Sequence, residues 1–198
     1  MSPKLVIGIA GMPGSGKSLV CNVARLRGIP VISMGDVVRK EAQRLGLPIT
    51  RFTLSQLAIT LRKQEGLDAI AKRCIHSIEK LKAPVVVIDG LRSPFEYFRF
   101  KKSFPDFKLI FVHASPGTRF RRLILRGRED DPQDWFDFIA RDLNEIKLGI
   151  PALVILSDYI LVNENKPLEK VLEEANLLLE VILSYANKSC SRGRHKAY

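Results

Sequence analysis

Glycines, a lysine and a serine come together near the start of the chain at the spacing that binds polyphosphates. Residues 11–18 read Gly-Met-Pro-Gly-Ser-Gly-Lys-Ser, which satisfies the pattern G-x-x-x-x-G-K-[ST] at every fixed position. Because glycine has no Cβ, Gly14 and Gly16 let backbone N–H groups approach a phosphate and form an anion-binding nest. Lys17 is expected to bring an ammonium group to the β- and γ-phosphates, and Ser18 to bind Mg²⁺. The predicted ATP-binding residues are Gly11, Met12, Pro13, Gly14, Ser15, Gly16, Lys17, Ser18 and Leu19.

The segments around this loop have the patterns that the motif requires. Residues 5–10 are an apolar run typical of a buried parallel strand, and residues 19–26 have the pattern of a packed helix. This order disfavours the alternative of a glycine-rich turn that binds nothing. Further strand-like runs, separated by helical patterns, are residues 31–33, 85–89, 109–114 and 159–163. The alternation predicts an α/β fold of the P-loop NTPase type, with three α/β/α layers around a five-stranded, mostly parallel sheet.

Length, charge and cysteine content limit the class of protein. The chain has 198 residues, which suits one α/β domain, and no apolar run approaches the roughly 18 residues of a membrane span. Its three cysteines are widely spaced, which argues against a disulfide framework or a metal site and favours the cytoplasm. The net charge of +11 fits either a nucleic-acid surface or arginines gathered around small phosphorylated substrates.

Polar residues follow two of the predicted strands. After residues 31–33, Gly35 allows a turn, Asp36 can cap a new helix, and Arg39 stands one turn inside it, where it can grip a phosphate. A plain helix cap and a solvated arginine are the alternatives. After residues 85–88, Asp89 has the position of an aspartate that holds Mg²⁺ beside the loop serine, with a loop cap as the alternative.

Arginines are concentrated between residues 119 and 128. Several guanidinium groups suit phosphoryl transfer, because they neutralise charge on the transferring oxygens, and Asp130 and Asp131 can orient them. A salt-bridged surface helix is the alternative. Asp131 is also expected to cap a helix that starts at Pro132, and Thr53 to cap an earlier one. The later helix is expected to bury Trp135, Ile139, Leu143 and Ile146.

These blocks together resemble nucleoside monophosphate kinases. S-x-G-D-x-x-R, D-G-x-R and R-x-R-x-D-D occur in order, and the pattern over residues 4–165 is most similar to archaeal adenylate-kinase-related proteins. The sequence departs from the adenylate kinase pattern at three positions. Arg92 comes one residue early, Met34 replaces a threonine, and Glu96 stands near the place of a glutamine that reads adenine.

The resemblance implies roles for individual residues. It places catalysis on Lys17, Arg122, Arg126, Arg128 and Arg141, acceptor binding on Gly35, Asp36, Arg39 and Arg92, and Mg²⁺ on Ser18 and Asp89. It also implies one domain over residues 1–187, with a helical insertion at 35–82 that binds the nucleoside monophosphate and a lid at 126–149.

The activity that follows from this resemblance is transfer of the γ-phosphoryl group of ATP to an acceptor nucleotide, AMP first, with CMP or dephospho-CoA as other acceptors. A P-loop ATPase or nucleotide-binding regulator acting on RNA or ribosomal particles is the alternative. The basic tail at residues 188–198 is expected to be flexible, either as a solubilising end or as a contact for RNA.

Overall fold

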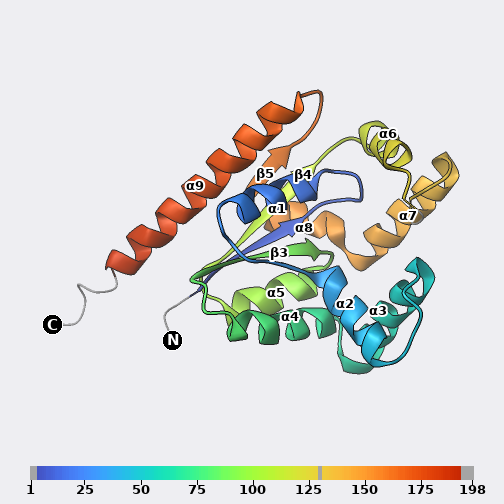
Figure 1. The fold of residues 1–198 in the computed structure, drawn as a ribbon, viewed down its shortest axis with the longest axis horizontal. Helices are drawn as coiled ribbons and strands as arrows, with labels where there is room; N and C mark the ends of the chain where they lie inside the picture. Colours follow the sequence, from blue (N-terminus) through green and yellow to red (C-terminus); the bar gives the residue numbers. More distant parts are fainter. Residues whose placement is uncertain (1–3, 129–130, 193–198) are drawn as a thin grey trace.

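A five-stranded parallel sheet forms the centre of the protein (Figure 1). The structure, a computed structural model, describes residues 4–128 and 131–192. The sheet order is β2-β3-β1-β4-β5, and every neighbouring pair is parallel. The strands are β1 (Leu5–Ala10), β2 (Val31–Ser33), β3 (Val85–Leu91), β4 (Phe107–His113) and β5 (Tyr159–Val162).

Helices cover both faces of this sheet. They are α1 (Lys17–Leu26), α2 (Met34–Arg44), α3 (Arg51–Glu65), α4 (Ala69–Lys80), α5 (Pro94–Ser103), α6 (Pro116–Arg126), α7 (Trp135–Leu148), α8 (Ile150–Leu156) and α9 (Leu168–Arg192). Side chains alternate between the faces, so Val6 packs with α2, α4, α5 and α8, whereas Ile7 packs with α1 and α9. Figure 1 shows α1 and α9 on one side and α4 and α5 on the other. The predicted three-layer α/β/α fold is confirmed.

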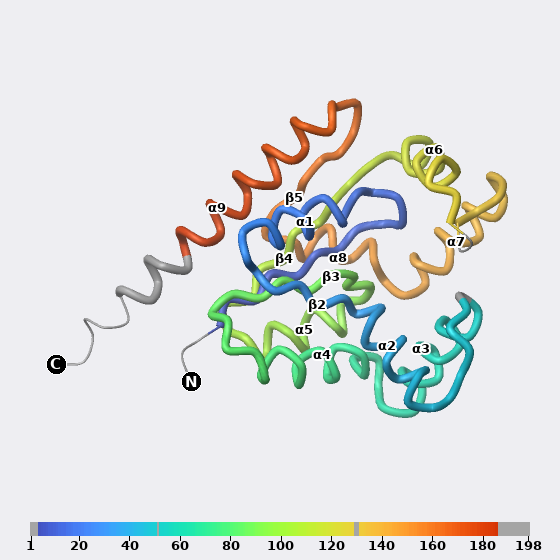
Figure 2. The backbone as a smooth tube through the Cα atoms, viewed as in Figure 1, coloured from blue at the N-terminus to red at the C-terminus, as the bar shows by residue number. Residues whose placement is uncertain are grey.

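The site-forming segments lie at one edge of the sheet, where the parallel strands end (Figure 2). The phosphate-binding loop leaves the end of β1, the central strand, and Asp89 lies in register with Ile9 of β1 and Ser33 of β2. Helices α2 and α3 lie on one side of this edge, and α6 and α7 lie on the other. In open α/β sheets this edge is where ligands bind.

Two predicted helix caps are wrong by three residues. The N–H of Thr53 donates to the hydroxyl of Thr50, which caps α3, so Thr53 lies inside the helix. The N–H of Asp137 donates to Asp134, which caps α7, and Asp131 does not cap this helix. Each segment contains two suitable cap residues three positions apart. The earlier one caps α3 and the later one caps α7, so residue type alone does not predict which of the two is the cap.

The inward face of α7 also differs from the prediction. Trp135, Leu143 and Ile146 are exposed, and Ile139 is half-buried. Phe138, Asp142 and Glu145 are the buried residues of this helix. Arginines from α6 and from the end of β3 pair with the two acids, so ion pairing sets the orientation of α7 rather than apolar periodicity.

The C-terminal helix is longer than expected. It continues to Arg192, so residues 188–192, which the sequence assigned to a flexible tail, are helical. Residues 193–198 of that predicted tail lie outside the described residues. Within the described ranges, no helix has the length and apolar character needed to cross a membrane.

Candidate phosphate-transfer site

The phosphate-binding loop is held between α6 and the residue that follows β5. Gly16 has a φ of 98°, and a Cβ there would lie 2.2 Å from the Asn163 amide nitrogen. At Gly14, with a φ of 79°, a Cβ would lie 2.8 Å from the carbonyl oxygen of Arg119. Any side chain at either position would collide with neighbouring polar groups. The two glycines therefore allow close packing of the loop as well as its left-handed backbone.

Asn163 connects this loop to Arg122. Its side-chain amide donates to the carbonyl oxygen of Ser15 at 2.8 Å. The guanidinium of Arg122 donates to the side-chain and backbone oxygens of Asn163 at 3.0 and 3.1 Å. The other terminal nitrogen of Arg122, Nη1, is buried and has no hydrogen-bond partner among the described residues. Arg122 thus lies beside the loop, and the N–H groups of its Nη1 donate no hydrogen bond within the described part of the chain.

Lys17 lies in an environment that lowers the pKa of its ammonium group. Its ammonium donates to the carbonyl oxygens of Gly11 at 2.8 Å and Met12 at 3.3 Å. Burial lowers the pKa of Lys17 from 10.5 to about 8, against the opposing effect of the Asp89 carboxylate. A bound polyphosphate would favour the charged amine, so nucleotide binding and protonation of Lys17 are coupled.

Asp89 and the start of α1 fit a divalent cation. One oxygen of Asp89, Oδ1, is buried without a hydrogen-bond partner in the described part of the chain. Ser18, whose side chain is exposed, begins α1 together with Lys17. A hydroxyl and a carboxylate are hard oxygen ligands of the type that Mg²⁺ prefers. Burial, with Asp89 as the second cause, raises the pKa of the Cys21 thiol to about 12, so this neighbour stays protonated.

Arg92 lies just after β3 and pairs with α7. Its guanidinium donates to Glu145 at 2.7 Å, and its backbone N–H donates to Glu96 at 2.8 Å. Glu96 is fully buried and also accepts from Arg62 at 2.8 Å. Its carboxylate therefore fixes the positions of Arg92 and Arg62.

The start of α2 differs in two details from the sequence prediction. Gly35 lies inside the helix, which begins at Met34, so it forms no turn. Asp36 is the third residue of the helix and does not cap it; its carboxylate pairs with Arg39 instead. Both side chains of this pair are exposed. Arg39 is accessible to a ligand, but it does not line the phosphate cavity described below.

Asp131 accepts hydrogen bonds from three arginines of the predicted lid. It accepts from Arg126 Nε at 2.8 Å, from the backbone N–H of Arg128 at 3.1 Å and from Arg141 at 3.5 Å. These partners, Arg126 first, lower the pKa of Asp131, so the carboxylate stays ionised. The side chain of Arg128 is exposed. The sequence suggested that Asp130 and Asp131 orient these arginines. The hydrogen bonds show Asp131 in this role, and Asp130 lies outside the described residues.

A buried ion pair attaches α7 to α6 and to the phosphate-binding loop. Arg119 donates to both oxygens of Asp142, at 2.8 and 2.6 Å, and also to the carbonyl oxygens of Ala114 and Pro13. Its guanidinium lies 4.9 Å from the ring centre of Phe138. Bidentate pairing of this kind is geometrically specific. Arg119 therefore anchors the arginine cluster, and it does not line the phosphate cavity described below.

A cavity of about 130 Å³, roughly the volume of four water molecules, lies where these elements meet. It brings together Lys17, Arg92, Arg126 and Arg141 with the glycine-rich loop and Glu145. Arg39, Arg122 and Arg128 do not line it. Four cationic groups around a volume of this size suit the negatively charged oxygens of phosphate groups.

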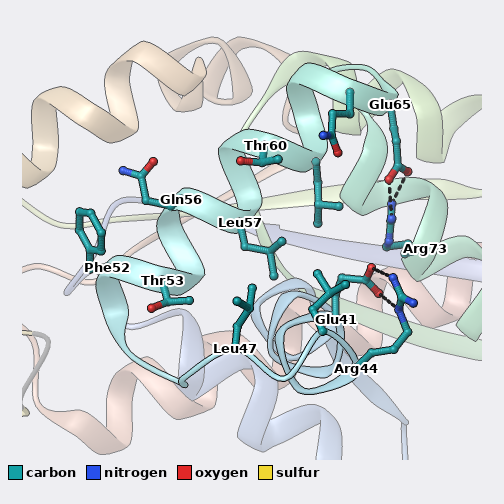
Figure 3. Close-up of a pocket in the computed structure, with 13 residues that line it drawn as sticks. Glu41, Arg44, Leu47, Phe52, Thr53, Gln56, Leu57, Thr60, Glu65 and Arg73 are labelled. Atoms are coloured by element: carbon teal, nitrogen blue, oxygen red, sulfur yellow. Dashed lines mark hydrogen bonds and ion pairs between the residues drawn. The ribbon is translucent and has the colours of Figure 1, made fainter.

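A larger hollow of about 590 Å³ lies in the helical segment between β2 and β3 (Figure 3). Leu47 and Leu57 point toward each other across it, and one face of α3 adds Thr53, Gln56 and Thr60. Two ion pairs, Glu41–Arg44 and Glu65–Arg73, lie at one end. As far as the described residues go, the hollow and the phosphate cavity share no lining residue, so the hollow is a separate feature of this segment.

Comparison with known proteins identifies the family of this chain. A family model described as an AAA domain matches residues 10–137, which include the glycine-rich loop and Asp89. The UPF0200 protein of Thermococcus onnurineus (strain NA1) is 42% identical over 184 residues, which cover 91% of this chain and 99% of that protein. The chain belongs to the UPF0200 family.

Solved structures place this UPF0200 chain among P-loop kinase folds. TT1252 from Thermus thermophilus has a TM-score of 0.67 at 20% identity, covering 93% of this chain and 98% of its own. Shikimate kinase from Bacteroides thetaiotaomicron has a TM-score of 0.61 at 19% identity, covering 89% and 98%. At these identities the likeness concerns the fold alone.

Three site residues of the UPF0200 chain escaped the sequence analysis. Asn163 stands directly after the last strand, at the ligand-binding edge, and this position could have marked it. Asp142 and Glu145 are three residues apart, on one face of the helix that follows the arginine-rich segment. Two acids at helical spacing near an arginine cluster were the available signal, and the apolar residues elsewhere on the same helix obscured it.

We expect ATP affinity to depend on pH through Lys17. As pH rises through about 8, the free protein loses the ammonium charge, so affinity falls by about tenfold per pH unit above that value. Calorimetric titration between about pH 7 and about pH 9.5 measures this. Lys17→Arg keeps its charge and should flatten the profile. A flat profile for the wild type would show that Lys17 does not contact the nucleotide.

We expect the Arg119–Asp142 pair to stabilise the position of α7. Asp142→Ala leaves a buried guanidinium without its partner and should lower the free energy of unfolding by about 3–5 kcal/mol. Adding Arg119→Met should restore most of that loss, because no buried charge remains. Urea denaturation measures both. Glu180→Ala breaks the more exposed pair with Arg27 and should cost about 0–1 kcal/mol, and an equally small effect of Asp142→Ala would contradict the anchoring role.

Proposed function

We propose that this protein is an ATP-dependent phosphotransferase whose acceptor is a nucleotide. The observation that carries this proposal is the cavity in which Lys17 of the donor loop shares a small volume with Arg92, Arg126 and Arg141. A simple nucleotide-binding site needs the loop and its lysine. The other cations face the loop from the end of β3, from α6 and from α7. Cations at such positions stabilise the charge on a phosphoryl group that passes between two bound molecules.

The chain's residues would divide the work between donor and acceptor. The loop at residues 11–19 binds the ATP phosphates, and Lys17 contacts the β- and γ-phosphates. An acceptor phosphate oxygen forms a new bond to the γ-phosphorus while the bond to the bridging oxygen breaks, and ADP leaves. Arg126 and Arg141 meet the charge on the transferring oxygens, and Arg122 and Arg128 can join them. Ser18 and Asp89 would hold Mg²⁺, which supplies charge neutralisation at the donor phosphates.

The acceptor half is assigned to Arg92 and to the helices between β2 and β3. A guanidinium binds a phosphate through two parallel hydrogen bonds, and 49% of the Arg92 side chain is exposed. Gly35, Asp36 and Arg39 at the start of α2 would complete the acceptor site, in line with the resemblance to nucleoside monophosphate kinases. In this proposal residues 35–82 bind the acceptor and residues 126–149 serve as the lid. AMP is the first acceptor to test, followed by CMP and dephospho-CoA.

A coupled assay over a panel of nucleotides, with product detection by chromatography, tests the proposal. We expect one acceptor to yield a phosphorylated product, and Lys17→Met to lower kcat by about 100-fold or more. Lys170→Met changes an exposed lysine on α9 and should leave the rate unchanged. Hydrolysis of ATP without any phosphorylated acceptor would overturn the kinase assignment and favour the ATPase alternative.

A further inference from the structure

Among the described residues that line the phosphate cavity, Glu145 is the single acidic one. One of its oxygens accepts from Arg92 at 2.7 Å, and 9% of its side chain is exposed. The other oxygen is buried and has no hydrogen-bond partner among residues 4–128 and 131–192. A buried carboxylate with an unused oxygen is costly unless a ligand or its partners compensate it. Its position in a cavity built for phosphate therefore requires an explanation.

We infer that Glu145 holds Arg92 while the acceptor site is empty and is displaced from it by the acceptor's phosphate group. This inference rests on the proposed function, because it assigns a specificity role within the same site. A carboxylate and a phosphate both bind a guanidinium through paired oxygens. Two anions on the same face of Arg92 would repel each other, so an acceptor that binds there must replace Glu145.

The structure keeps this exchange local to one side chain. One turn earlier on α7, Asp142 is fixed by its two hydrogen bonds to Arg119. At the C-terminal end of the helix, a Cβ on Gly149 would lie 2.8 Å from Pro94, so this end packs closely against the start of α5. The backbone around Glu145 is therefore held at both sides, so the inferred exchange is a movement of its side chain and not of the helix.

The charge balance of the cavity explains why such a residue is useful. Lys17, Arg92, Arg126 and Arg141 repel one another when no phosphate is present. Asp131 pairs with Arg126 and Arg141 and is not among the described residues of the cavity lining, whereas Glu145 pairs with Arg92 from within that lining. Displacement of Glu145 costs interaction energy, so a ligand that lacks a phosphate at Arg92 would leave the pair closed. Glu145 thereby acts through Arg92 as a positioning residue that selects phosphorylated acceptors.

The variant Glu145→Gln tests the exchange in the full-length protein. It removes the competing charge and keeps the shape, so the KM for the acceptor should fall about tenfold while kcat stays within about threefold. Glu145→Asp, whose shorter side chain reaches Arg92 less well, should also lower KM. Glu173→Gln removes an exposed charge from α9, which lies outside the proposed lid, and serves as the matched control. Thermal unfolding confirms that each variant is folded.

A loss of kcat of about 100-fold in Glu145→Gln at unchanged KM would overturn the inference. That outcome would assign Glu145 to hydrogen bonding with a hydroxyl nucleophile. An unchanged or raised KM at normal kcat would overturn it equally. In Arg92→Met, where the exchange partner is missing, adding Glu145→Gln should no longer lower KM.

A binding measurement separates this inference from the proposed function. Inorganic phosphate, titrated by calorimetry in the absence of nucleotide, should bind Glu145→Gln about tenfold more tightly than the wild type. Equal affinities would overturn the displacement by phosphate even if the kinase assay succeeds. If no nucleotide is phosphorylated but the phosphate affinities differ as expected, the proposed function fails and the role of Glu145 on Arg92 stands.

Discussion

Mutual repulsion of like charges is the constraint on which the site depends. Lys17 and three arginines converge on a volume of about 130 Å³, and each would repel the others in the absence of an anion. Hydrogen bonds and carboxylates supplied by the chain make the arrangement possible before any ligand binds. The Lys17 ammonium donates to loop carbonyls, Asp131 pairs with Arg126 and Arg141, and Glu145 pairs with Arg92. Preorganised cations of this kind are what phosphoryl transfer requires.

The same constraint explains the structure around the site. Helix α7 turns acids inward, where a helix of this type normally presents apolar residues, and leaves Trp135, Leu143 and Ile146 exposed. The pair of Arg119 with Asp142 fixes this orientation and also reaches the carbonyl of Pro13 in the phosphate-binding loop. The loop, the arginine-rich helix and α7 are thus one connected polar unit, supported by the parallel sheet beneath it.

Structural features that depend on neighbouring residues in the chain could be predicted from the sequence alone. The glycine-rich loop, the position of Asp89 and the five strands depend on patterns within about ten residues, and each strand lies within two residues of its expected limits. Contacts between distant residues were not predictable. Glu96 pairs with Arg62, 34 residues earlier, and Asn163 bonds to Ser15, 148 residues earlier. The prediction of the buried face of α7 was wrong for the same reason. Hydrophobic periodicity considers only the apolar residues of the helix itself, and it does not include contacts with arginines from other elements.

In the proposed reaction, the donor and acceptor phosphates occupy one continuous site between the loop and Arg92. The affinity of a bisubstrate ligand, two adenosines joined by a five-phosphate bridge, tests it most directly. If both halves exist, the linked ligand should bind at least about 100-fold more tightly than ATP, and Arg92→Met should remove that excess without weakening ATP itself. A linked ligand that binds the wild type no more tightly than ATP would contradict the claim.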